Sequence, residues 1–152
     1  MMKKLFVVLL MLALCMGLVN VANAAIYTGT TGDCTWLFDE STGVLTISGS
    51  GEMADYSSSG DNVPPWASYK DSIKKIVINE GVTTIGKSAF YNCSSLTDVI
   101  MPGSVSAVGS NAFYSCAGLK NVEYWGITAP NNQKNAFSST TVKYIQVVFA
   151  KM

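Results

Sequence analysis

The sequence predicts a β-rich solenoid of repeated units with a β-hairpin cap at its N-terminal end. Two observations support this fold class: a stretch with the alternating pattern of a β-hairpin and a motif that recurs every 23 residues. At 152 residues, the chain has the length of one modest domain.

Residues 1–24 have the features of a secretory signal peptide. Lys3 and Lys4 precede an uncharged apolar run, and the segment ends in a small-residue pattern, Ala22-Asn23-Ala24, that suits signal peptidase. The apolar run is shorter than the roughly 20 residues needed to span a bilayer. We therefore expect a secreted or cell-surface protein with no membrane span after signal cleavage.

The composition excludes several common kinds of function. The chain contains no histidine and its basic residues are all lysines, so a Ser-His-Asp triad, a histidine metal site and an arginine phosphate clamp are excluded. After signal cleavage, eight lysines remain against ten acidic residues. This weakly acidic balance argues against a nucleic-acid partner, which requires clustered positive charge. No catalytic residue, metal ligand or cofactor is predicted, and we do not expect an enzyme.

Residues 25–69 are predicted to form the β cap and a connecting loop. Trp36-Leu37-Phe38, a turn over 39–43 and Val44-Leu45-Thr46-Ile47 follow the hairpin pattern. Such a hairpin would cover the apolar layer that an open solenoid end exposes. The Ser- and Gly-containing segment 56–65 is expected to join the cap to the first repeat.

Residues 70–149 contain the repeated motif. Ile85-Gly86 and Ala89-Phe90-Tyr91 recur as Val108-Gly109 and Ala112-Phe113-Tyr114, and a degraded copy carries Ala136-Phe137. The pattern Leu96-x-x-Val99-x-Met101, with this period, is typical of a leucine-rich repeat solenoid. We expect about four strands, beginning near Ile73, Leu96, Leu119 and Val142. They would form a short parallel sheet, with short helical turns on the opposite wall and the phenylalanines stacked inside.

The stretch from Ile85 to Pro102 resembles the BspA-like leucine-rich repeat of bacterial surface proteins. The upstream segments Gly32-Asp33-Cys34-Thr35-Trp36, 43–51 and Pro65-Trp66 are similar to the cap that often precedes those repeats. The resemblance covers roughly residues 26–149 and weakens at Thr140, which replaces the repeat cysteine. It implies a binding or adhesive role and carries over no catalytic residue.

The outward face of the predicted sheet is the main candidate site. With the expected register, its side chains form a mixed polar surface that includes Tyr144 and Trp125, and aromatic side chains of this kind favour recognition. A merely solvated sheet is the competing interpretation. The predicted binding residues are Lys74, Lys75, Thr97, Asp98, Lys120, Asn121, Glu123, Trp125, Lys143 and Tyr144.

The remaining candidate sites have competing structural explanations. Cys93 and Cys116 occupy equivalent positions in successive repeats, where either a disulfide or a pair of buried free thiols would fit, and we favour free thiols. Asp39 and Glu40 fit a solvated turn better than a catalytic pair. The oxygen-rich segment 55–62 does not match a known calcium loop.

The sequence therefore predicts an exported, non-enzymatic binding or adhesion module. We expect a protein or glycan ligand, with protein–protein recognition favoured. The alternative is a secreted carbohydrate-binding module that uses Trp66 and Trp125 as stacking platforms. The apolar, β-prone stretch Ile145–Phe149 also predicts either self-association through the C-terminal strand, because an uncovered strand can pair with another chain, or fraying of that strand.

Overall fold

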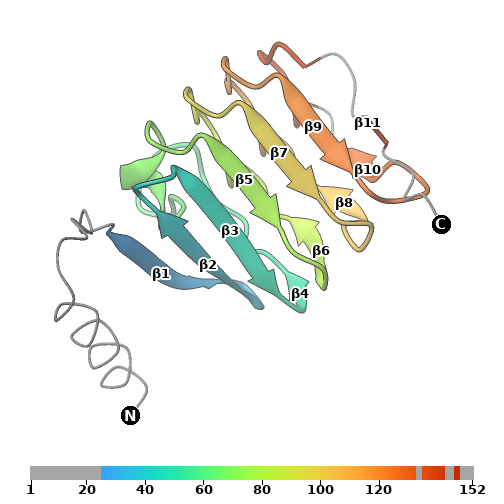
Figure 1. Ribbon diagram of the computed structural model, residues 1–152, viewed down its shortest axis with the longest axis horizontal. Coiled ribbons are helices and arrows are strands. Elements are labelled where there is room, and N and C mark those ends of the chain that lie inside the picture. The colour runs from blue at the N-terminus through green and yellow to red at the C-terminus, as the bar shows by residue number, and fades with distance from the viewer. Residues whose placement is uncertain (1–24, 133–134, 143–145, 148–152) are drawn as a thin grey trace, which may run out of the picture.

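The computed structural model describes residues 25–132, 135–142 and 146–147, which form two β-sheets facing each other across an apolar core (Figure 1). The predicted signal peptide, residues 1–24, lies outside these ranges, as do Lys143 and Tyr144. No helix in the described ranges is long and apolar enough to cross a membrane.

The larger sheet has seven strands and combines an antiparallel end with a parallel body. Its strands are β1 (Ile26–Thr31), β2 (Cys34–Asp39), β3 (Val44–Gly49), β5 (Lys75–Ile78), β7 (Asp98–Met101), β9 (Asn121–Tyr124) and β11 (Gln146–Val147), in this spatial order. β1, β2 and β3 pair antiparallel, whereas the strands from β3 to β11 pair parallel. β3 therefore connects the N-terminal hairpin to the repeats within one continuous sheet.

The smaller sheet is wholly parallel and lies behind the larger one in Figure 1. It contains β4 (Gly51–Glu52), β6 (Val82–Ile85), β8 (Ala107–Val108) and β10 (Asn131–Asn132), so each repeat contributes one strand to each sheet. The sequence analysis did not predict this second sheet, and it also missed β1.

The third wall of each repeat consists of tight turns, so the predicted short helical turns are wrong. In the first complete repeat, backbone N–H groups of Ala89, Tyr91 and Cys93 each donate to the carbonyl three residues earlier. The N–H groups of Ser88, Phe90 and Asn92 instead donate to carbonyls of the next repeat, at 2.8–3.0 Å. Half of the amide groups thus bond between repeats, which a continuous helix would prevent. The one helix in the described ranges is the short 3-10 helix η2 (Ala67–Tyr69).

The core is built from residues at equivalent repeat positions. Inward-facing side chains of neighbouring strands lie opposite each other, as Ile76 does to Val99 and Val99 to Val122. Behind them, aromatic rings stack in sequence from Trp66 through Phe90 and Phe113 to Phe137, with centroid separations of 5.5, 5.2 and 4.9 Å. Phe90 and Phe113 are fully buried.

The N-terminal hairpin packs on this core through a second aromatic group. Tyr27 on β1 stacks on Tyr69 at 4.2 Å, and Phe38 on β2 stacks on the same ring at 5.3 Å. The buried hydroxyl of Tyr56 donates a 2.7 Å hydrogen bond to Thr31 Oγ1. These contacts fix the hairpin to the segment that leads into the first repeat.

Candidate binding surface

The outer face of the seven-stranded sheet presents its side chains in straight rows. Lys75 lies opposite Asp98, and Asp98 lies opposite Asn121. The next outward row runs through Val77, Ile100 and Glu123. The structure therefore brings most of the sequence-predicted site residues together on one face.

A further row lies at the start of the strands. The backbone N–H of Thr97 donates to the carbonyl of Lys74 at 2.8 Å, and the N–H of Lys120 donates to the carbonyl of Thr97 at 2.9 Å. These three residues are consequently aligned across the face, with the two lysine side chains exposed. Lys143 and Tyr144, predicted as the fourth members of the Lys74 row and of the Lys75 row, lie outside the described residues.

The carboxylate of Asp98 is held in one orientation at the centre of the polar part of this face. Thr97 Oγ1 donates to its Oδ2 at 2.5 Å, and Asn121 Nδ2 donates to its Oδ1 at 2.7 Å. The hydrogen bonds from Thr97 and Asn121 lower the pKa of Asp98, and the charges of Lys75 and Lys120 act in the same direction. The face thus offers an ionised, oriented acceptor flanked by two lysines.

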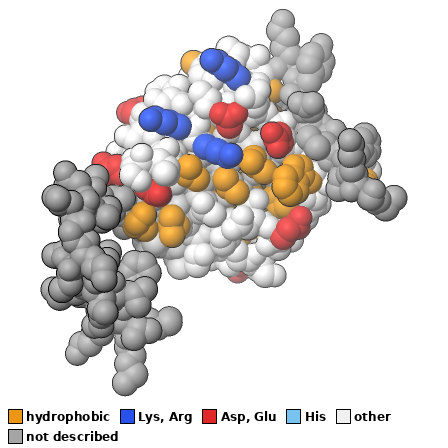
Figure 2. Space-filling view, viewed as in Figure 1, with side chains coloured by type: hydrophobic (Ala, Val, Ile, Leu, Met, Phe, Trp, Pro, Cys, Tyr) orange, Lys and Arg blue, Asp and Glu red, His pale blue; other side chains and the backbone are white. Residues whose placement is uncertain are grey.

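An apolar strip, defined here as Val77, Ile100 and Trp125, runs beside this polar group. Val77 and Ile100 are half-buried, whereas the Trp125 side chain is 53% exposed. Together with Pro102 they line a shallow hollow of about 150 Å³, with Glu80 among its other lining residues. Figure 2 shows hydrophobic side chains gathered across the middle of this face, next to lysines and acidic residues.

Sequence reasoning placed Val77 and Ile100 on the outward face but counted only Trp125 of the strip among the binding residues. Val77 and Ile100 stand at outward positions of their strands, where a solvated sheet face usually carries polar residues. Two apolar residues at neighbouring outward positions were therefore a readable signal. The row extends towards the hairpin through Thr46 to Leu37, which is 40% exposed.

The structure contradicts the use of Trp66 as an exposed sugar-stacking platform. Its side chain is 1% exposed, and its indole Nε1 donates a 2.9 Å hydrogen bond to the carbonyl of Ala89. Trp66 is instead the first ring of the internal aromatic stack. Of the three tryptophans, only Trp125 presents a large exposed surface.

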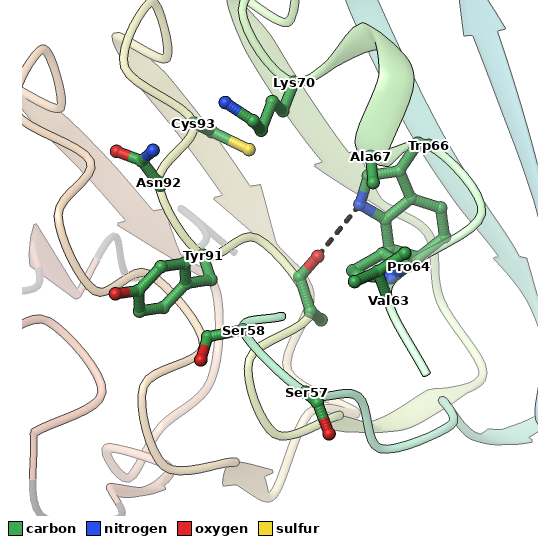
Figure 3. A pocket seen from close by; sticks show the side chains of 11 residues that line it. Ser57, Ser58, Val63, Pro64, Trp66, Ala67, Lys70, Tyr91, Asn92 and Cys93 are labelled. Carbon is green, nitrogen blue, oxygen red and sulfur yellow. Dashed lines mark hydrogen bonds between the residues drawn. The ribbon is translucent and has the colours of Figure 1, made fainter. Parts of the chain in front are cut away.

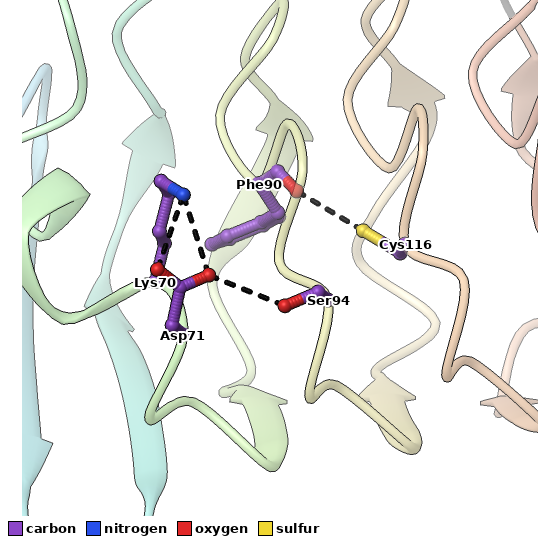
Figure 4. A network of polar contacts seen from close by, with 5 residues as sticks. All are labelled: Lys70, Asp71, Phe90, Ser94 and Cys116. Atoms are coloured by element: carbon purple, nitrogen blue, oxygen red, sulfur yellow. Dashed lines mark hydrogen bonds and ion pairs between the residues drawn. The ribbon is translucent and has the colours of Figure 1, made fainter.

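The three cysteines of the described ranges, Cys34, Cys93 and Cys116, are buried free thiols. Cys116 Sγ donates to the carbonyl of Phe90 at 3.1 Å (Figure 4). The pKa of Cys93 is raised well above its usual value, because its thiol shares a hydrogen bond with Cys116 and is buried. A protonated, buried thiol is a poor nucleophile, so Cys93 belongs to the packing of the repeat wall.

The other candidate carboxylates serve local structure. Asp39 Oδ1 accepts hydrogen bonds from the backbone N–H and the hydroxyl of Ser41, at 2.9 and 2.6 Å, as the residue before a tight turn commonly does. Asp55 Oδ1 accepts the backbone N–H of Lys87 at 2.7 Å, which ties the connecting segment to the first repeat.

Parallel strands that recur at an offset of 23 residues, with apolar side chains inside, fit the class of leucine-rich repeat proteins. Residues 62–149 match the BspA type leucine rich repeat region, with six copies. The chain belongs to this family.

Comparison with one solved structure supports the same fold. The chain is 32% identical to a leucine-rich repeat protein from Eubacterium ventriosum, with a TM-score of 0.58, over 71% of this chain and 28% of that one. A leucine rich cell surface protein from Faecalibacterium prausnitzii is 24% identical, with a TM-score of 0.37, over 66% of this chain and 31% of that one. The chain thus spans about a third or less of either protein. No curated protein matches the sequence.

Proposed function

We propose that this chain is an exported, non-enzymatic binding module that recognises a protein partner at or outside the cell surface through the outer face of its seven-stranded sheet. The observation that carries the proposal is the apolar strip, formed by half-buried Val77 and Ile100 and exposed Trp125, beside the fixed carboxylate of Asp98. Interfaces commonly combine an aromatic anchor with such a polar rim. Export is supported by the signal-like leader, residues 1–24.

The chemistry of the face favours a protein over a glycan. The hollow beside Trp125 has apolar walls from Val77, Ile100 and Pro102, which suit an aliphatic or aromatic side chain. The neighbouring Asp98 has both carboxylate oxygens already engaged, yet each oxygen keeps a free lone pair for a partner's N–H group. A lysine or backbone amide of a protein would satisfy these acceptors.

We further propose that the β1–β2 hairpin acts as the N-terminal cap of a solenoid. It places Tyr27 and Phe38 over Tyr69, and so covers apolar surface that the first repeat would otherwise expose. This arrangement leaves the outer face of the sheet free for binding.

The test combines crosslinking with a matched pair of variants. A photoreactive amino acid at Asn79, which borders the hollow, should crosslink a partner from culture supernatant or host extract, identified by mass spectrometry. Purified partner should then bind the wild-type protein, and Trp125→Ser should weaken binding by about tenfold or more. Ile127→Ser is the control, because Ile127 is 87% exposed but lies outside the strip.

Two results would count against the proposal. The first is a folded Trp125→Ser variant that retains full affinity for the partner. The second is a sugar-dependent signal on a glycan array that Trp125→Ser abolishes, which would support the carbohydrate-binding alternative instead.

A further inference from the structure

A second, separate pocket lies on the turn wall, away from the outer sheet face. It has a volume of about 160 Å³ and lies between the segment 57–70 and the tight turn at 89–93. Figure 3 shows Tyr91 on one side of this pocket and Trp66 with Pro64 on the other, with Lys70 and Cys93 near each other at one end. Cavities of about 150 Å³ hold a benzene molecule in other proteins, so the pocket has room for one aromatic ring.

The pocket occupies the place where an aromatic ladder on the protein surface stops. Tyr91 and Tyr114, at equivalent repeat positions, stack with a centroid separation of 5.3 Å and an interplanar angle of 6°. The residue 23 positions before Tyr91 is Ser68, so the preceding repeat supplies no ring. Of the other lining residues, eight precede Tyr91 and two, Asn92 and Cys93, follow it, and none comes from the repeat that carries Tyr114. We therefore place the pocket on the side of the Tyr91 ring opposite Tyr114.

The pocket also has a distinct polar character. Lys70 is the one charged residue among those that line it, and no acidic side chain does so. Its Nζ lies 3.3 Å from Asp71, whose carboxylate also accepts a hydrogen bond from Ser94 Oγ at 3.2 Å (Figure 4). Asp71 is thereby drawn towards the neighbouring repeat, and Lys70 keeps further N–H donors for an anion. Ser58 and Asn92 add neutral polar groups to the lining.

From this geometry we infer that the turn-wall pocket binds a small planar aromatic acid. The aromatic ring of the ligand stacks on Tyr91 and so extends the Tyr91–Tyr114 ladder, and the acidic group of the ligand pairs with Lys70. Aromatic stacking supplies shape selectivity, while the single lysine supplies the preference for an anion over a neutral analogue. This site is independent of the partner-binding face described above.

Nuclear magnetic resonance offers a direct test, because Trp66 is a local reporter. Its indole N–H donates to Ala89, and both residues line the pocket. Titration of the ¹⁵N-labelled protein, expressed without its predicted leader, with phenylacetate should shift the Trp66 indole peak. The Trp125 peak, on the outer face, should not move. For a ligand of this size we expect a dissociation constant on the order of 1 mM.

Two analogues and two pairs of variants identify the contacts. Phenylacetamide lacks the charge and cyclohexylacetate lacks the planar ring, so both should bind about threefold to tenfold more weakly. Tyr91→Leu should weaken phenylacetate binding by a similar factor, whereas Tyr114→Leu, at the equivalent position outside the pocket, should not. Lys70→Met should remove the preference for phenylacetate over phenylacetamide, while Lys87→Met should preserve it.

Several outcomes would overturn the inference. The first is a Trp66 indole peak that does not move at a phenylacetate concentration ten times the expected dissociation constant. The others are phenylacetamide or cyclohexylacetate binding as tightly as phenylacetate. If Tyr91→Leu fails to fold, Ser58→Phe replaces it, because Ser58 is exposed and a larger side chain there should block the pocket. Undiminished binding to a folded Ser58→Phe variant would equally refute the site.

Discussion

Truncating Phe113 to alanine tests whether the stacked phenylalanines are the main stabilising element of the repeats. Phe113 is fully buried between Phe90 and Phe137, at centroid separations of 5.2 and 4.9 Å. Removing a buried phenylalanine side chain typically costs about 3–5 kcal/mol, because apolar contact is lost and a cavity remains. The loss of two stacked neighbours places this site towards the upper end of that range.

The effect should be visible in urea unfolding followed by tryptophan fluorescence. With a slope of about 2 kcal/mol per molar urea, a loss of about 4 kcal/mol lowers the midpoint by about 2 M. Phe113→Leu, which keeps most of the volume, should cause a much smaller decrease, and Tyr114→Ala on the half-buried outer ladder should also cost less. A midpoint for Phe113→Ala equal to that of the wild type would refute the reasoning about the core.

Three further predictions concern the charged face, a packed glycine and the C-terminal strand. Hydrogen bonds lower the pKa of Asp98 in the folded state, so its stabilising contribution is present above the ordinary carboxyl pKa of about 4. This contribution is lost as the pH falls through the lowered pKa of the folded state. In acid unfolding experiments, Asp98→Asn should therefore make the free energy of unfolding less dependent on pH in this range. Gly126→Ala should lower the free energy of unfolding by about 1–3 kcal/mol, and with it the unfolding temperature, because a Cβ there meets the ring of Tyr124. Gly103→Ala, whose Cβ would come no closer than 3.2 Å to a neighbouring atom, should cost less, and similar thermal unfolding of the two variants would argue against this packing. Self-association through Ile145–Phe149 stays a prediction, since most of that stretch lies outside the described residues. Light scattering should show concentration-dependent assembly, and Val148→Lys should abolish it. A wild-type protein that stays monomeric at all concentrations would exclude self-association.

The repeat spacing was enough to predict the main strands and their inward side chains. An offset of 23 residues places Phe90 and Phe113 at equivalent positions, and equivalent positions of stacked repeats lie side by side. The same offset predicted the pairing of Lys75 with Asp98 and of Asp98 with Asn121. These features depend on periodicity, which a single sequence displays.

The features that the sequence did not reveal depend on contacts between distant segments. The strands of the smaller sheet are two to four residues long, and they are strands only because neighbouring repeats supply their hydrogen-bond partners. β1 carries a weak pattern, Ile26–Thr31, with a glycine in its middle, and is defined by its pairing with β2. The turn-wall pocket likewise depends on where the segment 57–64 lies against Tyr91, which no local pattern specifies.

The tight turns explain how the fold can tolerate an unusual outer face. Residues at the two ends of each turn adopt a left-handed backbone conformation, with φ of 52° at Ser88 and 58° at Asn92, and their equivalents Asn111 and Ser115 repeat these values. This geometry directs alternate N–H groups towards the next repeat, so backbone hydrogen bonds also join the repeats along the wall of tight turns. Together with the buried aromatic stack, these bonds stabilise the architecture independently of the side chains of Val77, Ile100 and Trp125. Val77, Ile100 and Trp125 can therefore remain exposed to a partner without weakening the structure that presents them.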